Sequence, residues 1–263
     1  MEILVCVRRV PDTSENEIQL NSAGNAIERD ELVYSINEPD NYAVEEALQI
    51  VAKTGGTVTV VTVGGEDDEE VLRREMAMGA NRGVLISDEA FDGSDGRGIA
   101  TILQAFAEKG QYDLILTGVQ AEDGGAQIGG MLAALLDYPF ASLVNSIEVL
   151  DRRKLKISRE IEGGNKEMNE IDLPCVLSIQ TGINEPRYVG MRGIRQVAGV
   201  PVPTFRAKDL GIDVSTVGEA GAKVKRVDYF VSVLGKGAEI LHGSREENVD
   251  RVLELVAAKG GLK

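Results

Sequence analysis

The 263-residue sequence has one histidine, two cysteines and no tryptophan. A metal site built from several histidines or cysteines cannot be assembled from His242 and two distant cysteines, so we expect no metal ligands. Neither G-x-S-x-G nor C-x-x-C occurs. We therefore expect no catalytic residues in the chain, and any chemistry should be carried by a cofactor.

Basic residues are also scarce, and the net charge of −15 argues against nucleic acid as a partner. No apolar run is long enough to span a bilayer, and the first residues are typical of a β-strand and not of a signal peptide. Cys6 and Cys175 lie in apolar, strand-like surroundings, which favours buried reduced thiols over a disulfide. Together these features indicate a cytoplasmic protein.

The first half of the sequence alternates strand and helix patterns. Apolar, β-branched runs predict strands at residues 3–7, 57–63, 83–87 and 113–117, and helical spacing predicts helices after Asp40, from Asp67 to Gly79, around 99–106 and after Gly125. Asp67 and Glu70 are spaced as a capping box for the second helix. This alternation predicts an α/β fold with a doubly wound, mostly parallel sheet.

The pattern changes after Pro139. Short strands are expected at 142–149, 154–161 and 167–172 as an antiparallel extension, with 175–179 returning to the main sheet. Residues 199–225 are rich in turn signals and predict an irregular excursion, and Ser244 with Glu247 predicts a capped final helix. We therefore expect an α/β domain over 1–198 and a C-terminal arm over 199–263.

In an open parallel sheet, ligands bind beyond the carboxyl ends of the strands, where the strand order reverses. Three segments follow such ends: 8–12, 64–66 and 118–125. Glycines precede the helices in the last two segments, and a free helix N-terminus favours a phosphate, so a nucleotide site is predicted here. Tight turns alone would also explain these glycines, and Arg8 and Arg9 could be phosphate ligands, interface residues or ordinary surface charges.

Six blocks of the sequence, in order, resemble signatures of electron-transfer flavoprotein beta subunits: 5–12, 37–47, 77–83, 118–123, 159–164 and 184–188. The resemblance implies a Rossmann-like (adenine nucleotide alpha hydrolase-like) domain and an arm that embraces an alpha subunit. In that family the alpha subunit holds FAD and the beta subunit buries AMP. The AMP contacts would fall on Cys6, Asn37, Glu38, Pro39, Asp40, Val63, Gly64, Asp123, Gly124, Gly125, Ala126, Gln127 and Ile128.

The resemblance also implies a recognition loop at 184–195, where a dehydrogenase docks. Its residues would be Arg187, Tyr188, Met191 and Ile194, with Met191 as the apolar anchor. The alternative is that Met191 packs under the arm. An ordinary member would relay electrons from an acyl-CoA-type dehydrogenase to a membrane quinone reductase.

Some residues depart from the ordinary family pattern. The loop at 123–127 is one residue shorter than usual, Ile128 replaces a phosphate-contacting threonine, Thr13 replaces an aromatic residue, and no lysine-rich stretch follows the recognition loop. Residues 10–13 are more similar to a branch that binds a second FAD and NAD(H) in the beta subunit and bifurcates electrons. Loop 184–194 resembles ordinary members. A stand-alone nucleotide-binding protein is a further alternative.

Overall fold

The computed structural model describes residues 1–121, 125–225, 227–231 and 237–261. The chain divides into two units: Met1–Gln19 with Glu28–Val227, and Leu20–Ile27 with Asp228–Lys263. The boundary we expected at residue 199 is therefore corrected, because 199–227 groups with the first unit.

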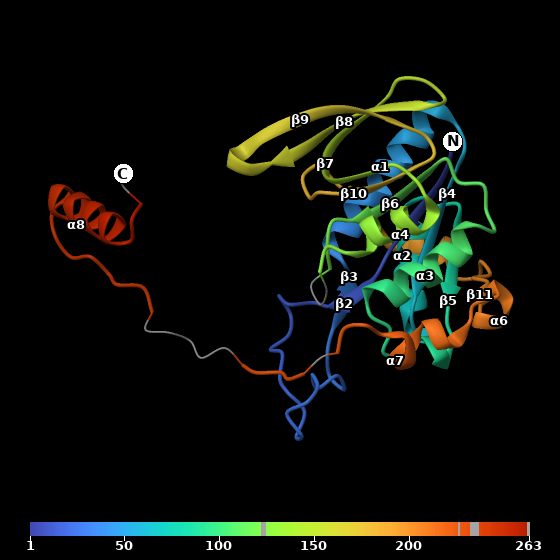
Figure 1. The fold of residues 1–263 in the computed structure, drawn as a ribbon, viewed down its shortest axis with the longest axis horizontal. Helices are drawn as coiled ribbons and strands as arrows, with labels where there is room; N and C mark the ends of the chain where they lie inside the picture. The colour runs from blue at the N-terminus through green and yellow to red at the C-terminus, as the bar shows by residue number, and fades with distance from the viewer. Residues whose placement is uncertain (122–124, 226, 232–236, 262–263) are drawn as a thin grey trace. The chain divides into compact units, whose positions relative to one another are not determined.

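The first unit is built on a nine-stranded sheet in the order β11-β5-β4-β1-β6-β10-β7-β8-β9 (Figure 1). The strands are β1 Glu2–Cys6, β4 Thr57–Val63, β5 Arg82–Ile86, β6 Leu114–Gly118, β7 Phe140–Val149, β8 Lys154–Ile161, β9 Asn165–Asp172, β10 Cys175–Ile179 and β11 Thr204–Phe205. Neighbours from β11 to β7 are parallel, and β7, β8 and β9 pair antiparallel. The predicted mostly parallel sheet with an antiparallel extension is confirmed.

Helices cover both faces of this sheet because its central strands are apolar on both sides. On one face, Ile3 and Val5 of β1 pack in the same core cluster as residues of α1 (Glu38–Thr54) and α2 (Glu69–Met78). The intervening Leu4 and Cys6 pack with residues of α3 (Gly96–Ala107) and α4 (Ile128–Leu136). The sheet grows outward in both directions from β1, so the strand order reverses between β1 and β6.

The start of α2 differs from the prediction. A 3₁₀ turn, η1 (Glu66–Asp68), precedes the helix, and the Asp68 carboxylate accepts a hydrogen bond from the Gly65 N–H at 2.7 Å. The predicted Asp67–Glu70 capping box is therefore wrong, since the extra turn places the cap two residues earlier, at Gly65 and Asp68. Gly79 ends α2 with φ 140°, as predicted.

Residues 199–225 are held to the body by strand pairing and by two aspartates. β11 extends the sheet beside β5, and the Asp88 carboxylate accepts from the Ala207 N–H at 3.1 Å, at the start of α6 (Ala207–Leu210). The Asp95 carboxylate, which caps α3, also accepts from the N–H groups of Lys223 and Val224 at 2.6 and 3.1 Å. These contacts explain why the segment belongs to the first unit. Pattern analysis missed them because each partner is distant in sequence.

The remaining elements are short, except for the last helix. They are β2 Arg9–Pro11 and β3 Tyr34–Ile36, which form a two-stranded antiparallel sheet, η2 Glu89–Phe91, η3 Glu162–Gly164, α5 Met191–Val197, η4 Val214–Thr216, α7 Gly218–Gly221 and α8 Arg245–Ala258. In the second unit the predicted capping box of α8 is confirmed, since Ser244 and Glu247 exchange hydrogen bonds of 2.8 and 3.3 Å. Within the described ranges, no helix has the length and apolar character that crossing a membrane requires.

Candidate functional site

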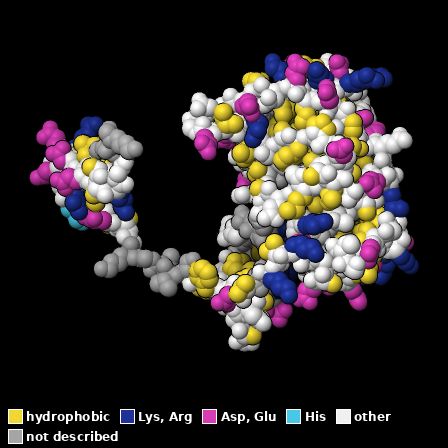
Figure 2. All heavy atoms as spheres, in the orientation of Figure 1, with side chains coloured by type: hydrophobic (Ala, Val, Ile, Leu, Met, Phe, Trp, Pro, Cys, Tyr) yellow, Lys and Arg dark blue, Asp and Glu magenta, His cyan; other side chains and the backbone are white. Residues whose placement is uncertain are grey.

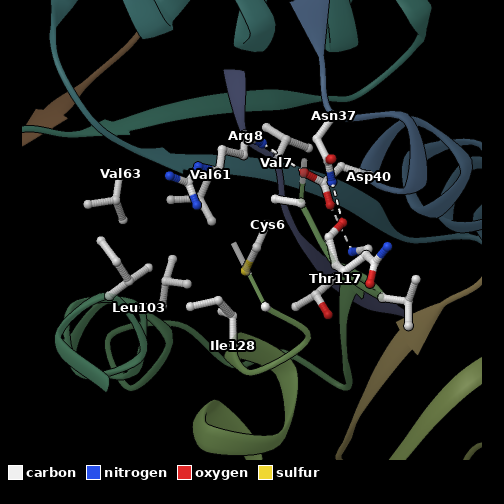
Figure 3. A pocket seen from close by; sticks show the side chains of 16 residues that line it. Cys6, Val7, Arg8, Asn37, Asp40, Val61, Val63, Leu103, Thr117 and Ile128 are labelled. Carbon is white, nitrogen blue, oxygen red and sulfur yellow. Dashed lines mark hydrogen bonds between the residues drawn. The ribbon is translucent and has the colours of Figure 1, made fainter. Parts of the chain in front are cut away.

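A pocket opens in the first unit where the strand order reverses, beyond the carboxyl ends of β1, β4 and β6 (Figure 3). It encloses about 700 Å³ of empty space, part of it continuous with solvent. The lining residues are Cys6, Val7, Arg8, Asn37, Asp40, Val61, Val63, Ile99, Leu103, Thr117, Gly118, Val119, Gln120, Ala121, Gly125 and Ile128. The pocket therefore lies where the sequence predicted a ligand site.

Asp40 connects the two strands that diverge at this point. Its Oδ2 accepts the backbone N–H of Arg8, just after β1, and its Oδ1 accepts the backbone N–H of Gly118, at the end of β6, both at 2.9 Å. A Cβ on Gly118 would lie 2.3 Å from Asp40 Oδ1, so only glycine allows this approach. The carboxylate thus holds the ends of both strands from the first turn of α1.

Burial raises the pKa of Asp40 to about 7, although hydrogen bonds from Asn37 and from the Gly118 and Arg8 backbones act in the opposite direction. Burial also raises the pKa of the Cys6 thiol, and the nearby Asp40 charge adds to this effect. Cys6 and Cys175 are both free and buried, which confirms the predicted state of the thiols. A thiol with a raised pKa stays protonated and is a poor nucleophile.

Asn37 leaves one hydrogen-bonding atom unused at the same end of the pocket. Its Nδ2 donates to the Gln120 carbonyl at 2.9 Å, which joins the start of α1 to the segment after β6. Its Oδ1 is buried and accepts no hydrogen bond from any described residue. Asn37 as a whole is only 2% exposed, and an unsatisfied buried acceptor is costly. A ligand that donates a hydrogen bond here would remove that cost.

The other end of the pocket is mainly apolar. Val61 and Val63 of β4 face Leu103 of α3 across it, and the Arg8 side chain extends toward the two valines (Figure 3). Ile99 of α3 also lines the pocket. Such a slot fits the faces of a flat aromatic group, and a guanidinium beside it can bind an anion. The pocket therefore combines an apolar slot, a cation and a group of buried acceptors.

Helix α4 begins at the pocket with Ile128, and within the described chain no side chain caps it. Its position is set by close packing: a Cβ on Gly129 would lie 2.2 Å from Ser178 Oγ and 2.9 Å from Thr117 Oγ1, two hydroxyls that hydrogen-bond to each other at 2.9 Å. The first N–H groups of a helix have no partner within the helix, so this terminus suits an anion.

The structure brings together six of the predicted nucleotide-binding residues: Cys6, Asn37, Asp40, Val63, Gly125 and Ile128 line the pocket. Glu38, Pro39, Gly64, Ala126 and Gln127 lie next to lining residues in the chain but do not line it, and Asp123 and Gly124 are outside the described residues. The N–H of Gly64 donates to the Ile86 carbonyl, and that of Gly65 donates to the Asp68 carboxylate, so both N–H groups of this turn already have partners within the protein. Sequence analysis missed Ile99 and Leu103, which look like ordinary core positions of a helix.

The predicted recognition loop is fixed to α1 by two buried carboxylates. The Arg187 guanidinium donates from Nε and Nη2 to the two carboxylate oxygens of Glu45, at 2.7 and 2.9 Å, and Asn184 Nδ2 donates to Glu46 at 3.0 Å. Burial opposes ionisation of Glu45, but the hydrogen bonds from Arg187 and Gln49 lower its pKa overall. Arg187 thus orients the loop as a bidentate partner of Glu45.

Three apolar side chains project from this fixed loop. Tyr188 is 92% exposed, Met191 64% and Ile194 41%. The short helix α5 that carries two of them is held against α2, where Arg73 Nη1 donates to the Val197 carbonyl at 2.8 Å. Met191 is thus presented on the surface, with most of its side chain accessible.

Figure 2 shows a further gathering of hydrophobic side chains on the face turned to the viewer, over the region where Figure 1 draws β10 and α4. On this face α4 has a largely apolar sequence but buries only part of it, and Phe140 at the start of β7 is 40% exposed. Large exposed apolar areas of this kind mark protein interfaces.

Glu75 of α2 is a buried carboxyl that none of these arrangements uses. It is 0% exposed, and neither carboxylate oxygen has a hydrogen-bond partner in the described structure. Burial raises its pKa to about 8; Arg74 opposes the shift, while Asp40 and Glu45 add to it. The neutral form of Glu75 therefore predominates below about pH 8.

No group of three or more His, Cys, Asp or Glu residues in the described ranges is arranged to hold a metal ion.

Comparison with known proteins gives a consistent family. Residues 25–210 match the model of the electron transfer flavoprotein domain. The chain is 33% identical over 260 residues to the electron transfer flavoprotein subunit beta of Methylophilus methylotrophus, covering 97% of this chain and 98% of the relative. It is 35% identical over 256 residues to that of Thermoanaerobacterium thermosaccharolyticum, covering 97% of each. It is also 33% identical over 252 residues to the caffeyl-CoA reductase-Etf complex subunit CarD of Acetobacterium woodii, covering 95% of each.

Proposed function

Since this chain belongs to the electron transfer flavoprotein family and matches its beta subunits over nearly its whole length, we propose that it relays electrons from an acyl-CoA-type dehydrogenase to a membrane quinone oxidoreductase. It does so as one half of a heterodimer with an alpha subunit that holds FAD. The flavin supplies the redox chemistry, and this chain supplies docking surfaces and a structural AMP.

The observation that carries the AMP assignment is the pocket at the reversal of strand order. Its apolar slot, between Val61, Val63 and Leu103, fits the faces of an adenine ring. The buried Asn37 Oδ1 lacks a donor among the described residues, and a nucleoside has hydroxyl and amino groups to supply one. Arg8 and the start of α4 are suited to the phosphate. In this role no residue of the chain needs to transfer a proton.

The exposed loop residues support the docking role. Transient interfaces depend on a few buried apolar anchors surrounded by polar contacts. Met191 on a loop fixed by Arg187 and Asn184 meets this requirement, because little ordering entropy remains to be lost on binding. The apolar face over α4 and β10 is better suited to the permanent alpha-subunit contact, since obligate interfaces are larger and more apolar.

A second candidate is the bifurcating type, with FAD in this pocket and NAD(H) as a substrate. The similarity to CarD, at the same identity as to the Methylophilus beta subunit, favours keeping this candidate, as does the segment 10–13. In that case the pocket would hold the adenylate part of FAD in place of AMP.

The nucleotide content of the co-expressed heterodimer tests the proposal. Mass spectrometry of the denatured complex should find one AMP and one FAD per heterodimer, and NADH should not bleach the flavin rapidly. Two FAD molecules without AMP, with fast bleaching by NADH, would establish the bifurcating type. A chain that stays monomeric and binds no flavoprotein partner would contradict both the ordinary and the bifurcating type.

A further inference from the structure

Asn37 and Asp40 place two buried hydrogen-bond acceptors at one end of the pocket. Asn37 Oδ1 accepts no hydrogen bond from the described residues. Both carboxylate oxygens of Asp40 already accept a backbone N–H each, and the carboxylate also has a hydrogen bond from the Asn37 side chain. A carboxylate oxygen has two lone-pair sites, so Asp40 keeps acceptor capacity after these bonds. Asn37 is 2% exposed and Asp40 6%. Both line the pocket, side by side in Figure 3.

This end of the pocket is opposite the apolar slot. In Figure 3 the labelled Val63 and Leu103 lie on one side of Cys6, and Asn37 and Asp40 lie on the other. A nucleoside has the same division, with a flat ring at one end and adjacent sugar hydroxyls, which are donors, at the other. With the ring in the apolar slot, the hydroxyls are the donors directed toward the two acceptors.

We propose that Asn37 Oδ1 and the Asp40 carboxylate together recognise the sugar hydroxyls of the ligand, so that the pocket selects ribonucleotides over their deoxy analogues. This inference rests on the proposed nucleotide site and adds its specificity. A site built to bind a hydroxyl rejects an analogue without it, because the buried acceptor is then left unpaired. Neither residue is catalytic; both are specificity-determining.

The same arrangement makes nucleotide affinity depend on the protonation state of Asp40. The ionised Asp40 is the better acceptor for the two backbone N–H groups and a hydroxyl, because hydrogen bonds to a carboxylate are stronger and protonation converts one acceptor site into a donor. The pKa of Asp40 is raised by burial to about 7, so the binding-competent fraction increases as pH rises through neutrality. For a hydroxyl that acts as the donor, we therefore expect affinity to rise with pH and to reach a plateau above the pKa of Asp40.

Other titratable and charged groups lie near Asp40 on the neighbouring elements. After β1, the Arg8 side chain favours its ionised form, and the Cys6 thiol within β1 stays neutral because burial raises its pKa. From α2, Glu75 interacts with Asp40 and is itself neutral below a pKa of about 8. From β6, only the Gly118 N–H makes contact with the carboxylate. Among the described residues that line the pocket, Asp40 is thus the group with a pKa near neutrality.

The test uses the co-purified heterodimer, equilibrated with isotope-labelled AMP, 2′-deoxy-AMP, 3′-deoxy-AMP or IMP, with bound nucleotide measured by mass spectrometry. We expect AMP to bind about 10- to 100-fold more tightly than at least one deoxy analogue, since a hydrogen bond to a charged group contributes about 1.5–3 kcal/mol. AMP affinity should rise about tenfold between about pH 6 and pH 8. Asp40→Asn should flatten this rise. The AMP phosphate still titrates in this variant, so any pH dependence that remains comes from the ligand and not from Asp40.

The outcomes are distinct. Equal affinity for AMP and both deoxy analogues, measured on the unmodified complex, overturns the inference even if Asp40→Asn fails to fold. Loss of affinity for IMP alone would also overturn it, because the acceptors would then read the base amino group. A complex that binds neither AMP nor its analogues would refute the proposed AMP site itself.

Discussion

Replacement of Glu75 by glutamine tests the effect of a buried carboxyl without a hydrogen-bond partner among the described residues. Glu75 is fully buried without a hydrogen-bond partner among the described residues, and its pKa rises from 4.5 to about 8 in the folded chain. The native state therefore keeps a proton that the unfolded state releases between these values. Because the folded state binds more protons in this window, stability falls as pH rises from about 4.5 to about 8.

The size of this effect follows from the shift. One pKa unit corresponds to about 1.4 kcal/mol, so between about pH 5 and pH 7.5 Glu75 lowers the free energy of unfolding by about 3 kcal/mol. Glu75→Gln stays neutral at every pH and removes this slope. The difference in unfolding free energy between Glu75→Gln and the unmodified protein should therefore grow by about 3 kcal/mol over that range, in favour of the variant.

The assay is urea unfolding of the purified complex at several pH values, followed by circular dichroism. Glu66→Gln is the matched control, because Glu66 is an exposed carboxylate just before the same helix. Its stability curve should run parallel to that of the unmodified protein. If Glu75→Gln also runs parallel, Glu75 is ionised and partnered in the folded protein, and the reasoning fails.

Three further predictions concern function. Gly118→Ala should weaken AMP binding at least tenfold, because its Cβ would lie 2.3 Å from Asp40 Oδ1; Gly199→Ala, with open space at the Cβ position, should bind normally in the same equilibrium assay. Met191→Glu should slow reduction by the dehydrogenase about tenfold or more with normal flavin content, since a charge replaces the 64% exposed apolar anchor; an unchanged stopped-flow rate would refute the docking role. Deleting the chain from residue 236 onward should weaken association with the alpha subunit in sedimentation velocity, because α8 carries exposed apolar side chains suited to a partner; unchanged affinity would show that the arm is not part of the interface.

Local patterns determined most of the fold. Alternating apolar strands and helices indicated the doubly wound sheet, because the central strands must be covered on both faces. The capping box at Ser244 and the helix stop at Gly79 were also readable, since both depend on residues within a few positions of each other. The packing of the segment 199–225 against the first unit could not be predicted from local patterns, because its partners Asp88 and Asp95 lie more than a hundred residues away in the sequence.

The candidate site divides in the same way. The sequence by itself determined that a ligand pocket should lie at the ends of parallel strands, since that follows from topology alone. Only the tertiary structure decided which residues meet there. It joined Asp40 to Arg8 and Gly118 and left Asn37 Oδ1 unpaired among the described residues. It also paired the N–H groups of Gly64 and Gly65 with Ile86 and Asp68. The physical reason is that hydrogen bonds between segments depend on three-dimensional distance, which one-dimensional spacing does not encode.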